Sequence, residues 1–306
     1  MKIYAVSDIH ADNGKYHSAY DLPCLIHEKI EKNREKAVLV ICGDVAQNIL
    51  VLHQYLKMFQ PIPIPKLFIA GNHDLWVEDG DDSLLKYLLS LKDACEDAGF
   101  HYLDQQPYTI DTIGFVGNIG WYDYSFKCAT TGLTEGLQLI RNNTSQVIRW
   151  EDLKDEDYEA KTLMGEVNGN LFNVTTWNDK FHIHWSFSDK EFTKRCLYQT
   201  QKHISQIRKK VNHFVFCSHH IHFQEGIVIK NKARWDFNNA YMGSREIGDV
   251  ILQEEKLRLV LFGHSHESGQ YRIANRIPAF NVSFHPREDV TSLDINPIDG
   301  SIVPAD

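Results

Sequence analysis

Five short apolar runs in this chain each end in a residue that can bind a metal ion. The runs are Ile3–His10, Val38–Asp44, Leu67–Asp74, Phe214–His220 and Leu259–His266. Each contains four or five apolar residues rich in Val, Ile and Phe, which is typical of a buried strand. In open α/β sheets, ligands bind in the crevice outside the carboxyl ends of the strands. Five strand ends that deliver Asp, His and Asn side chains to one crevice therefore predict a metal site.

The positions of these residues also bear on domain organisation. The candidate ligands run from Asp8 to His266, so a division of the 306-residue chain into halves would split the site. We therefore expect one catalytic domain over residues 1–306. A hydrophobic content of 43% and a charged content of 24% are ordinary for a globular protein with a full core. The formal net charge of −9 argues against a broad basic surface for nucleic acid, but not against a nucleotide or a short strand in a positive pocket.

Other features bear on location. The sequence has no run of about 18 apolar residues, so no membrane span is expected. Its first residues, MKIYAVSD, include a charge too early for a signal peptide. The six cysteines lack Cys-x-x-Cys spacing, and Cys42 and Cys217 lie inside apolar runs, which favours reduced thiols in the core. These features predict a cytoplasmic protein.

Helical patterns separate the strands, and strand–helix–strand order at this spacing predicts a layered α/β fold. A long helix is predicted from Glu191 to Val211, opening with a capping box of Ser188 and Glu191. Further expected elements are a helix with Leu52, Leu56 and Phe59 on one face, a helix with Leu84, Leu88, Leu91 and Cys95 on one face, a strand at Ile113–Val116, and a hairpin within Val290–Val303.

Residues 126–189 differ from the rest of the chain. The segment is polar, acidic around Glu151–Glu159, carries Trp150, Trp177 and Trp185, and has no obvious ligand motif. We interpret it as an insertion or cap over the mouth of the site. A peripheral flap with structural tryptophans is an equal alternative. His182 and His184 alternate in a strand-like run, which favours a solvated strand face over a ligand role.

The motifs resemble those of the calcineurin-like metallophosphoesterase superfamily. All five blocks of that superfamily occur in the right order, as Asp8-x-His10, Gly43-Asp44, Gly71-Asn72-His73-Asp74, His219 and Gly263-His264-Ser265-His266. Asp-x-His or Gly-Asp alone is a weak signal, whereas Gly-Asn-His-Asp and Gly-His-x-His directly after an apolar strand are fairly specific. The resemblance implies an α/β fold in which two mixed β-sheets pack as a sandwich flanked by helices, giving four layers.

The resemblance also implies a set of ligands for two divalent metal ions. Asp8, His10 and His266 are expected to bind one ion and Asn72, His219 and His264 the other, with Asp44 as a bridge. Independently, carboxylate, imidazole and amide groups suit Mn, Fe, Zn or similar ions better than a soft thiolate metal. The glycines before Asp44, Asn72 and His264 are expected at tight turns where a Cβ atom would be crowded.

The implied activity is hydrolysis of a phosphate monoester or diester by in-line attack of a metal-bridging hydroxide. His73 holds the general-acid position of the superfamily, and Asp74 is expected to orient its ring; a purely structural histidine is the alternative. The segment Gly43–Asn48 lacks the Asp-Arg-Gly of the protein phosphatases, and Asp74 stands where they have Glu, which disfavours a protein Ser/Thr phosphatase. The expected partner is a small phosphorylated substrate, with a nucleotide as one candidate. A nuclease and a non-catalytic scaffold with the same fold are the other hypotheses. The sequence does not specify the substrate, the metal or the oligomeric state.

Two substrate-binding candidates complete the prediction. In Ser218–His222 the usual His-x-Pro is missing; His219 aligns best, while His220 or His222 could be the ligand instead. His220 is otherwise a candidate for supporting a ligand from behind, for facing the substrate, or for an ordinary surface histidine. Arg245 follows the predicted N-cap Ser244, where a cation is unfavourable unless an anion is near. Arg245 is therefore a candidate for binding the substrate phosphate, with a surface ion pair to Glu246 or the acidic insertion as the alternative.

Overall fold

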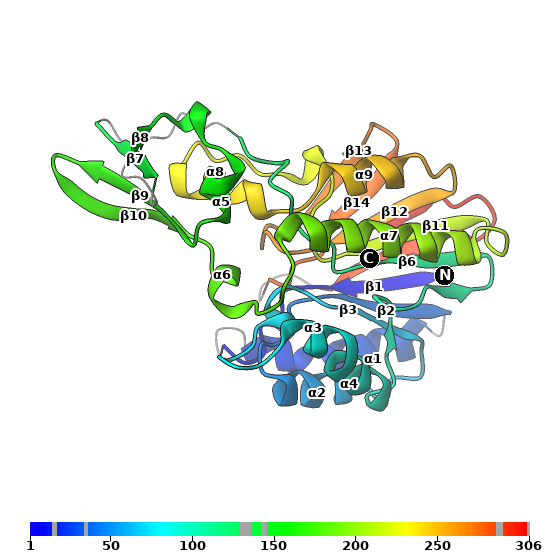
Figure 1. Ribbon diagram of the computed structural model, residues 1–306. Coiled ribbons are helices and arrows are strands. Elements are labelled where there is room, and N and C mark those ends of the chain that lie inside the picture. The colour runs from blue at the N-terminus through cyan, green and yellow to red at the C-terminus, as the bar shows by residue number, and fades with distance from the viewer. Residues whose placement is uncertain (14–16, 34–35, 129–135, 142–145, 286–289, 305–306) are drawn as a thin grey trace.

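Two six-stranded mixed sheets form the centre of the described part of the protein, and helices cover their outer faces (Figure 1). The computed structural model describes residues 1–13, 17–33, 36–128, 136–141, 146–285 and 290–304. In order across the first sheet, the strands are β16 (Ile302–Pro304), β15 (Thr291–Ile295), β1 (Lys2–Val6), β2 (Ala37–Cys42), β3 (Lys66–Ile69) and β4 (His101–Tyr102). In the second sheet they are β13 (Gly269–Ile273), β14 (Ile277–Asn281), β12 (Leu257–Phe262), β11 (His213–Ser218), β6 (Ile113–Asn118) and β5 (Tyr108–Ile110).

The two sheets pack face to face through alternate residues of their strands. In β1, Ile3 and Ala5 belong to the core between the sheets, whereas Tyr4 and Val6 belong to the core beneath the helices. This alternation follows from the two-residue period of a strand, and because both faces are covered, both sets must be apolar. The predicted sandwich of two mixed sheets between helical layers is confirmed, as are all five strands inferred from the apolar runs.

The helices form the outer layers. The first sheet is covered by α1 (Leu22–Asn33), α2 (Ile49–Lys57), α3 (Ser83–Leu85), the π-helical segment η3 (Lys86–Ser90) and α4 (Leu91–Asp97), and the second by α7 (Asp189–Ile207) and α9 (Arg245–Leu252) (Figure 1). The capping box predicted for the long helix is present at the start of α7, where the Glu191 carboxylate accepts from the Ser188 amide at 2.8 Å. The C-terminal hairpin is confirmed by the antiparallel pair β15 and β16.

The predicted insertion contains a third sheet. Its strands, in spatial order, are β10 (Asn170–Thr176), β9 (Thr162–Val167), β7 (Gln138–Arg141) and β8 (Gln146–Ile148). The sheet extends away from the two-sheet core, beside α5 (Asp155–Glu159) and α8 (Ala233–Asn238) (Figure 1). The remaining short elements are η1 (His17–Asp21), η2 (His73–Leu75), η4 (Trp150–Asp152), α6 (Asp179–His182), η5 (Gln224–Gly226) and η6 (Asn239–Tyr241).

The prediction of a strand at His182 and His184 is wrong. His182 ends the short helix α6, and its ring stacks on Trp76 with centroids 4.5 Å apart. The backbone carbonyls of His182 and His184 accept from the amides of Val77 and Ser83, so neighbouring loop amides take the place of a sheet partner. Within the described ranges, none of the helices combines the length and apolar character that a membrane crossing needs.

Candidate metal centre

The residues that follow β1, β2 and β12 bring four potential ligands together at one end of the sandwich. Ligand atoms of Asp8, His10, Asp44 and His266 all lie within 4.8 Å of one another. The His10 and His266 rings are stacked, and their Nε2 atoms approach to 3.4 Å. Asp8 and Asp44 are fully buried, whereas the His266 side chain is 45% exposed, so one side of the group is open to solvent.

A second group forms around the Asn72 side chain, which follows β3. Its Oδ1 atom lies 3.0 Å from His219 Nε2 and 3.1 Å from His264 Nδ1. Asp44 adjoins both groups, because its Oδ2 atom lies 3.6 Å from His10 Nε2 and 3.4 Å from His219 Nε2. The structure thus brings all seven predicted ligands together, from strands of both sheets.

Hydrogen bonds on the far side of two imidazoles indicate which nitrogens face the centre. His219 Nδ1 lies 2.9 Å from the Cys42 carbonyl, and His264 Nε2 lies 3.3 Å from the Tyr241 carbonyl. Since a carbonyl only accepts, both of these nitrogens must carry the proton. When both rings are neutral, as metal ligands must be, the opposite nitrogens, His219 Nε2 and His264 Nδ1, present lone pairs to each other at 3.1 Å. Two lone pairs at this distance repel unless a cation lies beside them, so the donor set fits a bound metal.

The backbone at the ligands is unusual. Asp8, His10, Asp44, His264 and His266 all have positive φ angles, between 46° and 74°. Residues other than glycine rarely adopt positive φ angles, and backbone strain of this kind concentrates at functional sites. A left-handed residue turns the chain sharply directly after a strand, and here it directs each side chain across the strand ends.

Two glycines permit the close approach of these turns. A Cβ atom on Gly71 would lie 2.2 Å from Asp44 Oδ1, and one on Gly263 would lie 2.5 Å from Asp8 Oδ2. Both distances are far below van der Waals contact. The expected crowding at the glycines before Asn72 and His264 is confirmed.

Burial and mutual charge set the electrostatics of the centre. Burial alone would raise the pKa of Asp44, but the neighbouring His219 and His73 outweigh it and hold that pKa well below its ordinary value. Burial would lower the pKa of His219, yet Asp44 and Asp8 raise it to about 9. For His264, burial dominates and lowers the pKa to about 3. Burial would also raise the pKa of Asp8, but His266 and His219 outweigh it and lower that pKa. The carboxylates of Asp8 and Asp44 are therefore ionised, and they give the site the negative charge that binds cations.

The comparison with protein families decides what the chain is. Residues 1–268 match the family model of the calcineurin-like phosphoesterases. The chain belongs to the calcineurin-like phosphoesterase family. It is thus a metal-dependent phosphoesterase, and the seven converging side chains form a donor set suited to the metals on which this family depends.

Solved structures support the same fold. A phosphopantetheinyl hydrolase from Mycobacterium tuberculosis aligns with a TM-score of 0.61 at 14% identity, over 94% of this chain and 90% of that one. A dimetal phosphatase from Danio rerio aligns with a TM-score of 0.51 at 11% identity, over 96% of this chain and 92% of that one. At these identities the likeness extends to the fold alone. No curated protein sequence matches the chain.

His73 lies at the rim of this phosphoesterase centre. Its ring stacks on Trp76 with centroids 3.7 Å apart and meets the His10 ring edge-on at 4.7 Å. Its backbone amide donates to Asp44 Oδ1 at 2.9 Å, which ties the loop to the centre. Burial lowers the pKa of His73 to about 4. The ring lines a cavity beside the ligands, so it is placed to contact a bound substrate.

The expectation that Asp74 orients the His73 ring is wrong. The buried Asp74 carboxylate turns inward, where it accepts from the amides of Asp44, Val45, Ala46 and Gly71 at 2.8–3.0 Å. These amides belong to the turns that follow β2 and β3, and they would lack partners without it. Asp74 therefore holds the loop that carries Asp44. Burial and the nearby Asp44 raise the pKa of Asp74 to about 7.

Asp179 is a residue that the sequence did not point to. It lies in the predicted insertion, and its Oδ1 atom accepts from Asn72 Nδ2 at 2.9 Å and from Trp76 Nε1 at 2.6 Å. Its Oδ2 atom accepts from Trp177 Nε1 at 3.0 Å and from the Tyr122 hydroxyl at 3.3 Å. Because Asp179 holds the amide nitrogen of Asn72, the amide oxygen must face His219 and His264.

His220 does not face a substrate. The residue is fully buried, with Nδ1 3.1 Å from the Ile119 carbonyl and its ring 4.3 Å from that of His264. It therefore packs behind a potential ligand. His222 is also buried, and its Nδ1 accepts from the Ser244 amide at 3.2 Å. Of the three histidines in this segment, His219 is the one that reaches Asn72 and Asp44.

Arg245 lies on the surface, so its expected contact with the substrate is not supported. Its Nε donates to the Ser125 carbonyl at 2.8 Å, Nη2 bonds Gln224, and the guanidinium lies over the Phe126 ring. The helix starts at Arg245 as predicted, but the Ser244 hydroxyl donates to Asp123 at 2.7 Å instead of capping it. These contacts account for a cation in the first turn without an anionic ligand.

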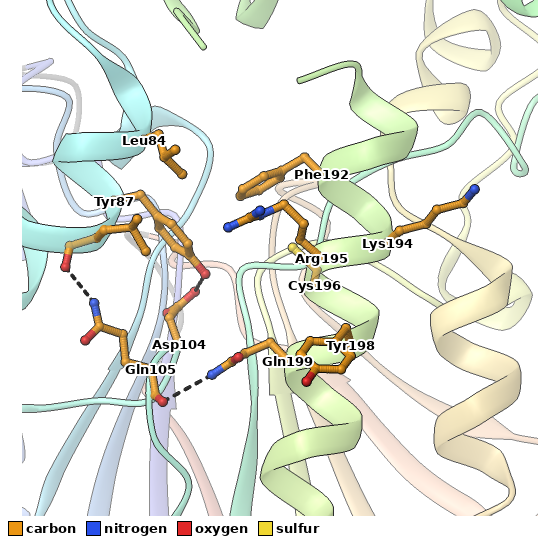
Figure 2. A pocket seen from close by; sticks show the side chains of 11 residues that line it. Leu84, Tyr87, Asp104, Gln105, Phe192, Lys194, Arg195, Cys196, Tyr198 and Gln199 are labelled. Atoms are coloured by element: carbon orange, nitrogen blue, oxygen red, sulfur yellow. Dashed lines mark hydrogen bonds between the residues drawn. The ribbon is translucent and has the colours of Figure 1, made fainter. Parts of the chain in front are cut away.

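Two cavities differ in their relation to the centre. One of about 210 Å³ is lined by Asp44, Asn72, His73, His264, Ser265 and His266, together with Trp177, Trp235, Asn238, Asn239 and Met242. A larger one of about 590 Å³ lies between η3 and α7, where Tyr87, Asp104 and Arg195 are among its walls (Figure 2). None of the seven potential ligands lines the larger cavity. A further cavity, of about 390 Å³, shares His73 and His266 with the smaller one and is also lined by His10, Asp12, Asn13, Gln47 and Trp76. The two cavities that adjoin the potential ligands together form the candidate substrate site.

Proposed function

We propose that this chain hydrolyses a phosphate ester of a small molecule, monoester or diester, with two divalent metal ions. The observation that carries the proposal is the position of the Asp44 carboxylate between two groups of donors, 3.6 Å from His10 and 3.4 Å from His219. One carboxylate that adjoins two groups of ligands suits a dinuclear site, because it can contact both ions at once.

The donor set supports an assignment of each ligand. Asp8, His10 and His266 would hold one ion, Asn72, His219 and His264 the other, and Asp44 both. When bound, two divalent ions would supply positive charge and Lewis acidity at the phosphoryl group. Oxygen and imidazole donors suit Mn, Fe or Zn. The two carboxylates neutralise half of the formal charge of such a pair, so the site would attract an anionic phosphate.

His73 would protonate the leaving oxygen. Its ring lines the cavity next to His10, and Trp76 restricts its orientation by stacking. Burial disfavours the protonated ring, but an anionic ester in the cavity would favour it, because a nearby opposite charge stabilises the charged form. Stacking on Trp76, rather than a carboxylate partner, would thus position the acid.

We also propose that residues 126–189 form a cap on a single domain that spans 1–306. Trp177 lines the cavity and Asp179 bonds Asn72, so this segment contacts the site directly. A peripheral flap would lie away from the site and would not contact Asn72, whereas Asp179 of this segment accepts a hydrogen bond from it. The cap would restrict the cavity to small substrates, which argues against a phosphoprotein.

The test is to load the protein with Mn²⁺ and to measure metal content and turnover together. The substrates are p-nitrophenyl phosphate for monoester activity and bis-p-nitrophenyl phosphate for diester activity. We expect two ions per chain and hydrolysis of at least one substrate. Asp44→Asn should lose metal and turnover, whereas Asp97→Asn, a change on the exposed surface of α4, should keep both. Two bound ions without hydrolysis of either ester would instead indicate a scaffold.

A further inference from the structure

The wall of the small cavity opposite the metal ligands is aromatic and uncharged. Apart from Ser265, which lies between two ligands, it consists of Trp177, Trp235, Asn238, Asn239 and Met242, none of which titrates. This cavity of about 210 Å³ adjoins the cavity of about 390 Å³ through His73 and His266. Because its wall is aromatic and uncharged, this part of the site suits an uncharged ring system better than a charged chain.

Trp177 is held rigidly at this wall. One face of its indole is stacked on Tyr241, with centroids 4.4 Å apart and planes 6° from parallel. Its Nε1 atom is fixed by Asp179 at 3.0 Å and by the Tyr122 hydroxyl at 3.2 Å. The ring also lies 5.8 Å from that of His264, which places it next to the candidate metal centre. A fixed indole can stack on a ligand without losing conformational freedom when the ligand binds.

Trp235, in α8, is fixed in a comparable way. The Lys230 ammonium covers one face of its ring at 3.4 Å from the centroid, and Nε1 donates to the Val228 carbonyl at 2.8 Å. The neighbouring Asn238 accepts from Thr175 Oγ1 at 2.7 Å through its amide oxygen. Its Nδ2 group has no hydrogen-bond partner among the residues that the structure describes, and the side chain lines the cavity. It is therefore available as a donor to a ligand.

We propose that Trp177 and Trp235 bind an uncharged planar ring of the substrate and that Asn238 donates a hydrogen bond to the edge of that ring. The substrates of this site are then phosphate esters that carry an aromatic or heteroaromatic group, such as nucleotides. This inference rests on the proposed function, since it places the ring beside the ions that hold the phosphate. Stacking on tryptophan accepts any flat ring, and the amide selects rings with an acceptor on their edge.

Two pairs of compounds isolate the ring. Adenosine 5′-monophosphate and ribose 5-phosphate share their phosphate linkage and differ in the base. Thymidine 5′-methyl phosphate and dimethyl phosphate are diesters with the same methanol leaving group, and only the first carries a ring. For each pair we measure kcat/KM with Mn²⁺-loaded protein, and by calorimetry we measure the affinity for adenosine 5′-monophosphate and ribose 5-phosphate.

Three variants complete the design. Trp235→Leu removes a ring that bonds none of the metal ligands, and Asn238→Ala removes only the donor. Trp185→Leu is the control, since Trp185 stacks on Phe192 and does not line the cavity. We expect Trp235→Leu to lower kcat/KM for the ring-bearing member of a pair by roughly 5- to 150-fold, as for the loss of one stacked base. The member without the ring, the metal content and the Trp185→Leu variant should be unaffected.

The outcomes separate this proposal from the proposed function. Equal losses on both members of each pair, or no loss at all, would overturn the ring-binding role and leave hydrolysis established. If no ester is hydrolysed but adenosine 5′-monophosphate still binds in a Trp235-dependent way, the ring site stands and the enzymatic function fails. An absence of both hydrolysis and ring-dependent binding refutes both.

Discussion

Replacement of Asp179 by asparagine should loosen Asn72, a proposed metal ligand, without changing any of the proposed ligands themselves. The two carboxylate oxygens of Asp179 accept four hydrogen bonds, from Asn72, Trp76, Trp177 and Tyr122. Asparagine keeps one oxygen and replaces the other by an NH₂ group. Two of the four donors would then face a donor. The Tyr122 hydroxyl can turn and accept, and Asn72 can flip its amide, but neither indole can accept.

Both orientations of the new side chain are unfavourable. With its oxygen toward Asn72, the NH₂ group faces the Trp177 indole, whose remaining acceptor is the Tyr122 hydroxyl at 3.2 Å. With its oxygen toward Trp177, the NH₂ group faces the Trp76 indole, which is left without an acceptor, and forces the Asn72 amide to flip. A buried donor without a partner costs about 1–3 kcal/mol, more where the lost acceptor was charged. A flipped Asn72 would direct its NH₂ group at the cation. Loss of such a supporting contact typically lowers metal affinity about 10–100-fold.

The assay is metal content per chain after dialysis at a series of free Mn²⁺ concentrations, together with urea unfolding. We expect Asp179→Asn to weaken one of two ions and to lower the free energy of unfolding by a few kcal/mol at most. Asp189→Asn is the matched control. Asp189 is a similarly placed carboxylate that accepts from Trp121 Nε1 at 2.9 Å and from the Tyr124 hydroxyl, but it bonds no potential ligand. It should lose stability and keep both ions.

Two results would refute this reasoning. If Asp179→Asn keeps both ions at wild-type affinity while unfolding more easily, Asp179 supports the cap and not the ligand. If both variants lose metal equally, the effect arises from general loosening of the cap, and the hydrogen bond to Asn72 has no special part in it.

Three further predictions concern other parts of the site and the core. Gly71→Ala should abolish binding of both ions and destabilise the protein, because the added Cβ would lie 2.2 Å from Asp44 Oδ1. Metal analysis and thermal unfolding measure the two effects, and a variant that binds its full complement of ions would contradict the prediction. His73→Ala should lose about 10²–10⁴-fold in kcat on alkyl phosphates, far less on p-nitrophenyl esters, and no metal; equal losses would leave His73 a structural role. Burial raises the pKa of Asp104, whose carboxylate bonds Tyr87 (Figure 2), from 3.8 to about 7. As pH rises from about 4 to 7, the unfolded chain therefore releases this proton before the folded chain does, and the native state loses stability. Urea unfolding should show that the free energy of unfolding of the wild type falls relative to that of Asp104→Asn as pH rises over this range. If the difference between the two free energies stays constant with pH, the raised pKa of Asp104 is contradicted.

The fold, and the convergence of the candidate ligands at one end of the sandwich, could be predicted because both depend on local patterns. A buried strand needs a short apolar run, and the glycine or left-handed turn after it leaves a signature such as Gly71-Asn72 or Gly263-His264. The capping box at Ser188 is equally local, because its two partners are three residues apart. Patterns of this kind carry their physical cause within a few neighbouring residues.

The errors concern contacts between distant segments. Asp179 bonds a residue 107 positions away, and the segment around it contains no motif that would indicate this contact. The sequence could not show whether Asp74 turns toward its neighbour His73 or toward the amides after β2. For Arg245, helix-dipole reasoning identified an unusual cation correctly, but Ser125, 120 positions away, supplies the compensating carbonyl. Spacing along the chain gives no information on such partners.

The origin of the ligands in two sheets links metal binding to the fold. Asp8, Asp44 and Asn72 follow strands of the first sheet, whereas His219 and His264 follow strands of the second. Direct bonds already cross this boundary, since the His264 amide donates to the Asp8 carboxylate at 3.0 Å and His219 reaches the Cys42 carbonyl. With both imidazoles neutral, as metal binding requires, the centre holds two buried carboxylates beside His219 and His264 nitrogens that face each other at 3.1 Å, and these groups repel one another unless cations lie between them. Ions that bind only the native arrangement would remove this repulsion and stabilise the contact between the sheets. The sandwich thus places the proposed ligands, and bound ions would in turn stabilise the contact between the two sheets at the end where a substrate would bind.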